Sequence, residues 1–102
     1  MTYEYGFPAL SDPTRRQVYE LLRSGPRAVN EIARDMPVSR PAVSQHLKAL
    51  EMARLVRATR AGTRRLYEID ATGLAVMRIY LDSFWEVALQ NFKRHVEENH
   101  ER

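Results

Sequence analysis

Residues 39–56 read SRPAVSQHLKALEMARLV, and this stretch determines the expected fold class. Ser39 is a typical N-cap residue, and Pro41 falls in the first helical turn, where its missing N–H is tolerated. The apolar side chains that follow recur at helical spacing, at Val43, Leu47 and Leu50. The stretch therefore predicts a helix from Ser39 to about Ala53 with one buried face.

The outward face of this helix carries side chains that can bond to the edges of DNA bases. An α-helix fits the major groove, and residues near its N-terminus reach the base edges. Arginine can pair with guanine and glutamine with adenine, serine can bond to bases or phosphates, and a proline ring can touch a thymine methyl. The candidate DNA-binding residues of this helix are Arg40, Pro41, Ser44, Gln45 and Lys48. Any one of them alone could equally be an exposed residue without a partner.

A shorter helix is expected before this one, so that the two form a helix-turn-helix. Its apolar residues have the spacing i, i+3, i+4, i+7, as Val29, Ile32, Ala33 and Met36. Pro37 disfavours helical geometry at Met36, so the helix should end there. A turn of two residues then leads to the helix that Ser39 begins.

Two further helices are expected upstream. Asp12 and Pro13 are typical of an N-cap and a first helical position, and Gly25 is a natural helix end. Residues 5–10 predict a short first helix that Pro8 interrupts.

The hydrophobic period changes after the central helix, which predicts a β-hairpin. Residues 56–59 and 65–69 are short, β-prone and alternating, and residues 60–64 form a turn that contains Gly62. The hairpin is rich in arginine, with Arg57, Arg60, Arg64 and Arg65. Contact with DNA phosphates or the minor groove would explain these arginines. The alternative is that they protect an edge strand against aggregation.

A long last helix is expected from Ala71, after an Asp70 cap, to about residue 96. Its apolar stripe is longer than a domain of this size needs to close its own core, so it would leave a large exposed apolar patch on a monomer. We therefore expect homodimerisation through the last helix, with help from the residues before Pro13. The candidate interface residues are Phe7, Leu10, Leu81, Phe84, Trp85, Ala88 and Phe92.

Composition and charge fit one DNA-binding domain that spans residues 1–102. The chain has 102 residues, of which 44% are hydrophobic, and no cysteine. Residues 14–65 contain twelve basic and four acidic residues, a net charge of +8, whereas the flanking segments are acidic. No apolar run approaches the ~20 residues of a membrane span, and residues 1–10 do not look like a signal peptide. A cytoplasmic protein without membrane contact is expected.

Several motifs together resemble the ArsR/SmtB family of winged-helix repressors. They are residues 9–16 (ALSDPTRR), 31–33 (EIA), 41–50 (PAVSQHLKAL), 55–56 (LV) and the strand that runs from residue 62 to 69. The resemblance covers about residues 7–92. It implies a mainly α fold with a small β-hairpin, a winged helix-turn-helix that dimerises through its terminal helices. It also implies that Arg40, Ser44 and Gln45 lie in the recognition helix. In that family the repressor releases DNA when an effector binds to it, and the sequence does not identify the effector.

The chain departs from the metal-sensing members of that family. It has no cysteine for a thiolate site. At the spacing of a second family site, on the last helix, it has Asp82, Phe84, His95 and Glu98, so that a phenyl ring replaces one imidazole. Zinc prefers four tight ligands, so we expect no metal, no cofactor and no release of DNA by zinc.

Three function classes can be compared on these residues. A sequence-specific repressor that binds double-stranded operator DNA, an inverted repeat, is favoured by the basic recognition surface. The alternatives are a metal-responsive repressor that uses the last helix and a winged-helix module that binds protein instead of DNA. An enzyme is not expected, because no nucleophile–base pair, phosphate loop or paired carboxylates stand out.

Overall fold

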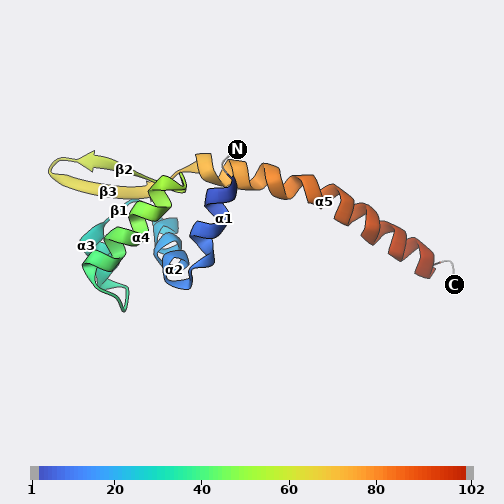
Figure 1. The fold of residues 1–102 in the computed structure, drawn as a ribbon, viewed down its shortest axis with the longest axis horizontal. Helices are drawn as coiled ribbons and strands as arrows, with labels where there is room; N and C mark the ends of the chain where they lie inside the picture. The colour runs from blue at the N-terminus through green and yellow to red at the C-terminus, as the bar shows by residue number, and fades with distance from the viewer. Residues whose placement is uncertain (1–2, 101–102) are drawn as a thin grey trace.

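The computed structural model describes residues 3–100 and is mainly helical, with one small sheet (Figure 1). The elements in chain order are α1 (Tyr3–Ser11), α2 (Pro13–Leu21), the 3-10 turn η1 (Leu22–Ser24), β1 (Arg27–Ala28), α3 (Val29–Arg34), α4 (Arg40–Met52), β2 (Val56–Ala61), β3 (Arg64–Ile69) and α5 (Ala71–His100). The predicted mainly α fold with a helix-turn-helix, α3–α4, and a following hairpin is confirmed.

The sheet has a third strand that the sequence analysis did not predict. Its order is β1-β3-β2, all antiparallel, and β1 adds only two pairs, Arg27 with Tyr67 and Ala28 with Leu66. A strand of two residues is too short to show an alternating pattern. The expected five-residue turn is also wrong, because Ala61 pairs with Arg64 and leaves only Gly62 and Thr63 between the strands. Gly62 has φ 66°, which suits a tight hairpin turn.

Helix bounds differ from the predictions at several ends. α1 runs through Pro8 without interruption, because the packing of Ala9 and Leu10 against the core outweighs the backbone bond that proline removes. The Ser11 hydroxyl donates to the Pro8 carbonyl at 2.7 Å and supports this last turn. α3 ends at Arg34, two residues before the predicted Met36, and α5 continues past residue 96 to His100.

The helix after Pro13 narrows into a 3-10 turn before it stops. α2 ends at Leu21, and η1 leads into Gly25, whose φ is 128°. The Gly25 N–H donates to the Leu22 carbonyl at 3.1 Å and closes this turn. The predicted end at Gly25 is therefore where the helical segment as a whole stops.

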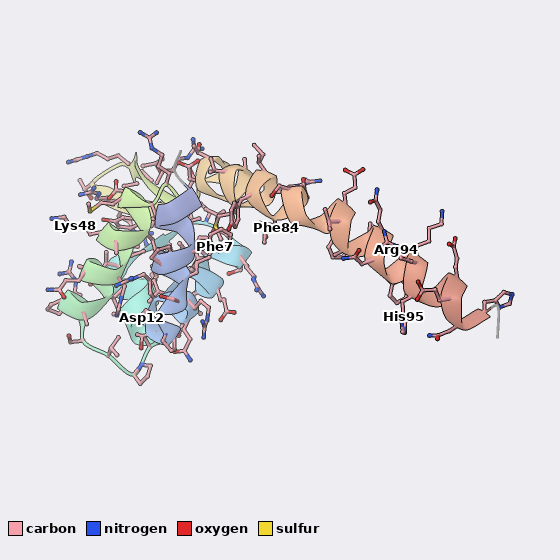
Figure 2. All side chains as sticks on the ribbon, turned by 45° about the vertical axis from the view of Figure 1, so that its right-hand side comes forward. Phe7, Asp12, Lys48, Phe84, Arg94 and His95 are labelled. Carbon is pink, nitrogen blue, oxygen red and sulfur yellow. The ribbon has the colours of Figure 1, made fainter. Side chains whose placement is uncertain are left out.

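α5 projects far beyond the rest of the molecule as a rod (Figure 1). The Cα extents are 66 × 28 × 21 Å and the radius of gyration is 18.4 Å, against about 13 Å for a compact chain of 100 residues. Gly73 and Met77 are the buried residues of this helix. Side chains of its outer half point away from the helix on several sides with no other element beside them (Figure 2).

Two close approaches fix the start of α5 on the remaining helices. A side chain at Gly6 of α1 would place its Cβ 2.6 Å from the Met77 sulfur, so α1 and α5 are in tight contact. At Gly73 a Cβ would lie 2.6 Å from the Arg54 carbonyl oxygen, which accepts the Gly73 N–H at 2.8 Å. Glycine is needed at both positions because any side chain would clash with these neighbours. The backbone conformations themselves do not require glycine.

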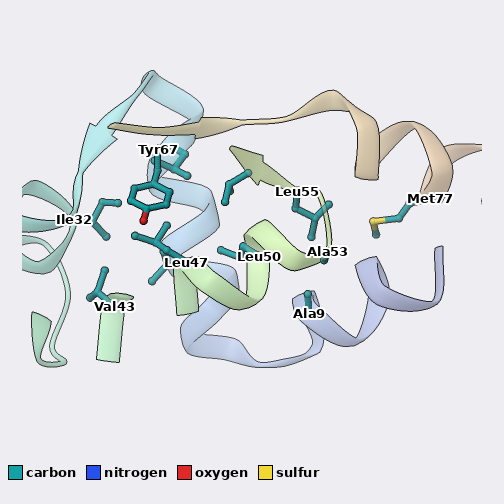
Figure 3. Close-up of a cluster of buried hydrophobic side chains, with 12 residues drawn as sticks. Ala9, Ile32, Val43, Leu47, Leu50, Ala53, Leu55, Tyr67 and Met77 are labelled. Atoms are coloured by element: carbon teal, nitrogen blue, oxygen red, sulfur yellow. The ribbon is translucent and has the colours of Figure 1, made fainter. Parts of the chain in front are cut away.

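The core lies between α2, α3, α4 and the sheet, and Ala9 of α1 and Met77 of α5 extend it toward the start of the last helix (Figure 3). Its fully buried side chains are Val18, Ile32, Val43, Leu47, Leu50, Leu55 and Val56. The predicted inward face of α4 is thus confirmed. Among residues 3–100, no helix is long and apolar enough to cross a membrane.

Candidate nucleic-acid interface

The packing of α4 turns its polar face outward. The Ser39 hydroxyl accepts the Ala42 N–H at 3.3 Å, so the predicted N-cap begins the helix. Its apolar face is completely buried, and the opposite face stays accessible. Of the five residues predicted for that face, Ser44 is half-buried, and the exposed ones are Arg40, Pro41, Gln45 and Lys48. Lys48 lies on the side of the molecule away from the free end of α5 (Figure 2).

Arg40 is held at the start of α4 by the preceding helix. Its Nε donates a hydrogen bond to the Asn30 amide oxygen on α3. The guanidinium therefore lies toward α3 and the hairpin, which favours contact with a DNA strand at the edge of the reading face.

Three of the four hairpin arginines already have carboxylate partners. The Arg57 Nε donates to the Glu68 carboxylate, directly opposite on β3, at 2.9 Å. The Arg64 guanidinium pairs with Glu31 of α3. Arg65 lies 3.8 Å from Glu51 of α4 and 5.5 Å above the Tyr67 ring.

Arg60, at the far end of β2, makes no ion pair with any residue from 3 to 100. The Arg57 partner could have been found from strand register, whereas the partners of Arg64 and Arg65 are distant in sequence. An exposed pair of this kind stabilises a fold by ~0–1 kcal/mol, so these pairs leave the arginines available to DNA.

A groove of about 470 Å³ lies between the hairpin and residues 28–30 of β1 and α3, and Arg40 at the start of α4 also lines it. Polar and basic side chains dominate its lining: Asn30, Arg40, Thr63, Arg64, Arg65 and Tyr67, together with Ala28 and Val29. It joins the predicted reading face of α4 to the predicted phosphate-binding arginines of the hairpin. Three guanidinium groups around one groove make it suitable for an anionic strand.

Glu31 places a negative charge beside Arg64, one of the arginines that line this groove. One of its carboxylate oxygens accepts the Ala28 N–H at 2.9 Å and also accepts from Arg64. The backbone N–H of Ala28, together with the nearby Arg64 cation, lowers the pKa of Glu31 although some desolvation opposes the change. Glu31 is therefore ionised at neutral pH.

The predicted dimer surface is largely exposed in the single chain. Phe84, Trp85 and Phe92 are 57%, 63% and 67% exposed. Leu81 and Ala88 on the same stripe are exposed too, while Phe7 and Leu10 of α1 are half-buried against the core. Edge-to-face contacts join Phe7 to Tyr80 at 5.6 Å and Tyr80 to Phe84 at 5.2 Å, so α1 and α5 present one continuous aromatic surface.

The residues at the family's metal-site spacing have other partners. Asp82 lies 3.8 Å from Arg78, and the His95 ring is 3.0 Å from the Asn99 amide. The part of the chain that the structure describes contains no group of three or more acidic, histidine or cysteine residues placed to hold one metal ion.

Comparison with known proteins assigns this arrangement to a family. Residues 12–58 match the model of the bacterial regulatory proteins of the arsR family. The HTH-type transcriptional regulator Rv2034 of Mycobacterium tuberculosis is 61% identical over 84 residues, which cover 82% of this chain and 78% of that protein. The chain belongs to the ArsR family. The transcriptional repressor SdpR of Bacillus subtilis is 37% identical over 67% of this ArsR-family chain and 76% of its own length.

Solved ArsR-family structures have the same fold as this chain. An ArsR-like transcriptional regulator from Rhodococcus sp. RHA1 superposes with a TM-score of 0.76 at 28% identity, over 91% of each chain. The homodimeric winged helix-turn-helix DNA-binding domain of Mb0332 from Mycobacterium bovis gives 0.64 at 33% identity, over 90% of this chain and 82% of that one. The winged helix-turn-helix expected from the sequence is therefore confirmed.

Proposed function

We propose that this ArsR-family chain is a homodimeric transcriptional repressor that binds double-stranded DNA in a sequence-specific manner. The observation that carries the proposal is the exposed polar face of α4 next to a basic hairpin, with Arg40 of α4 and two hairpin arginines, Arg64 and Arg65, lining one groove. Relatives that are named transcriptional regulators and repressors support the same role. Such a repressor acts in the cytoplasm, together with the DNA.

The reading face assigns different tasks to its side chains. Gln45 and Ser44 face the major groove and contact base edges, Pro41 contacts a thymine methyl, and Lys48 contacts the backbone. Arg40 lies nearest the hairpin, where Asn30 holds it. The β2–β3 hairpin is the wing of this fold. Its arginines contact phosphates or the minor groove, which gives affinity without reading of the bases: Arg57, Arg60, Arg64 and Arg65.

A two-fold dimer of this chain selects an inverted repeat as its operator. Phe84, Trp85 and Phe92 of both copies cover one another, with Phe7 of α1 at the edge of the interface. The two copies of α4 then enter successive major grooves, so the half-sites lie about one helical turn apart or somewhat more.

Replacing Gln45 by alanine tests the reading face. Gln45→Ala should weaken operator binding by ~1–3 kcal/mol and relax the preference at one base position in each half-site. Footprinting of DNA upstream of the chain's own gene identifies the operator, and titration of operators with single base changes measures the preference. Gln17→Ala, at an exposed glutamine of α2, is the matched control.

Two results would contradict this proposal. A wild-type chain that showed no salt-dependent binding to any duplex would fit a protein-interaction module. Unchanged affinity and base preference in Gln45→Ala would move the reading face elsewhere on the molecule.

A further inference from the structure

One arginine that lines the groove, Arg64, already has an acidic partner in the free protein. Glu31 and Arg64 come from different elements, α3 and β3; Arg64 lines the groove, and its guanidinium pairs with Glu31. This inference rests on the proposed DNA binding, since it concerns how strongly the same surface holds the phosphate backbone.

Glu31 and Arg64 differ in how firmly each is held. The Glu31 oxygen that binds Arg64 also accepts the Ala28 backbone N–H at 2.9 Å, so this carboxylate keeps a partner when Arg64 leaves. Arg64 borders the two-residue turn, and 56% of its side chain is exposed. The arginine can therefore turn toward an incoming anion while the carboxylate stays in place.

A DNA phosphate offers Arg64 the same chemistry as Glu31, two anionic oxygens in one plane with a guanidinium fork. We propose that Glu31 competes with a DNA phosphate for Arg64 and thereby weakens the hold of the groove on the DNA backbone. Because a backbone phosphate is present in every sequence, the effect acts on operator and random DNA alike.

The other two wing pairs are less suited to this role. Arg57 and Glu68 are opposite one another on the hairpin itself, so the pair moves as one with the wing. The Glu51 carboxylate lies 3.8 Å from Arg65, beyond hydrogen-bond distance, whereas Glu31 accepts a hydrogen bond from Arg64. The Glu31 pair is the one that joins α3 to an arginine of the wing that lines the groove.

Glu31→Gln tests the competition, because glutamine keeps an oxygen that can accept the Ala28 N–H but loses the charge. We expect this variant to bind a random-sequence duplex two- to fivefold more tightly than the wild type. The dependence of log affinity on log salt should steepen by up to about 0.9, the value for one additional phosphate contact. Fluorescence anisotropy at several salt concentrations measures both quantities.

Glu20→Gln is the matched control for the change in net charge. Glu20 is an exposed residue of α2 whose partner is Arg23, and its substitution should leave the salt slope unchanged. In an Arg64→Ala background, Glu31→Gln should also lose its effect on the slope, because the two groups act as a pair. Thermal melting of each variant followed by circular dichroism verifies that it is folded.

A second comparison leaves Glu31 unchanged. Arg64→Ala should flatten the salt slope less than Arg60→Ala, since Arg64 exchanges one anion for another and Arg60 does not. Equal or weaker binding by Glu31→Gln, or equal slopes for the two arginine variants, would overturn the competition and leave DNA binding intact. A wild-type chain without DNA binding would overturn the proposed function as well.

Discussion

Arg54 adopts a backbone conformation that few residues other than glycine accept. Its φ is 59°, in the left-handed region, immediately after α4. The Arg54 N–H donates to the Glu51 carbonyl and the Leu55 N–H to the Leu50 carbonyl, both at 3.0 Å, which is the pattern of a Schellman motif. Leu50 and Leu55 are both fully buried, so core packing holds the arginine in this conformation.

Arg54→Gly should therefore raise the free energy of unfolding by about 0.5–1 kcal/mol. The left-handed conformation costs a non-glycine residue ~1–2 kcal/mol, and the greater freedom of glycine in the unfolded chain offsets part of that gain. Urea unfolding measures the difference. Arg54→Ala removes the same side chain but keeps the Cβ and should give no such gain. Equal stabilisation by alanine and glycine would show that the side chain, and not the backbone, is the source.

Sequence patterns predicted burial at single residues better than they predicted partners. Val43, Leu47 and Leu50 are buried as expected, because helical spacing fixes which side of α4 meets the core. The partners of Arg40 and Arg64, Asn30 and Glu31, lie ten and thirty-three positions away along the chain. Whether residues so far apart in sequence meet depends on how α3 packs against α4 and the hairpin, and no local sequence pattern specifies that packing.

The wing differs from its prediction in length and in support. β2 and β3 continue to a two-residue turn, so the hairpin reaches farther from the body than a five-residue turn would allow. β1 pairs with Leu66 and Tyr67 in the middle of β3, so no third strand lies beside the tip. The sequence predicts a turn at residues 60–64 because they contain Gly62, and a glycine does not indicate how many of its neighbours continue the strands.

Arg60 lies near the tip of the hairpin, so replacing it is the clearest test of the hairpin's role in DNA binding. Arg60→Ala should weaken binding to all duplex sequences alike and flatten the salt slope by about one unit, because one phosphate contact is lost. Binding to the operator and to random duplexes across a range of salt concentrations measures this. Loss of discrimination between sequences at an unchanged slope would instead place Arg60 on the bases.

At the scale of the whole molecule, α5 carries an apolar surface that a single chain leaves exposed. The prediction of a long last helix is confirmed, although the helix extends four residues past the expected position. Its stripe was predicted as an interface because it exceeds the core, and the structure leaves Phe84, Trp85 and Phe92 mostly exposed. The partner itself lies outside any single-chain pattern, so the dimer stays a prediction.

Phe92→Glu should disrupt this dimer, because a buried charge would replace an aromatic contact. The wild type should sediment at twice the chain mass of 11.9 kDa at micromolar concentration, and the variant should raise the dissociation constant at least tenfold, or ~1.4 kcal/mol. Gln90→Glu adds the same charge on the opposite side of the helix and should remain dimeric. A monomeric wild type, or equal effects of both variants, would contradict the proposed interface.

The contact at Gly73 fixes the direction of α5 and, in the proposed dimer, the distance between the two DNA half-sites. α5 has 30 residues and is about 45 Å long at ~1.5 Å per residue. A tilt of about ten degrees at its start would move its far end by about 8 Å, more than two base-pair steps of ~3.4 Å. With the Arg54 carbonyl only 2.8 Å from the Gly73 nitrogen, the joint has no room for even a methyl group. A side chain at position 73 would therefore change the spacer between half-sites that the protein prefers, while each half-site would still be read by an unaltered α4.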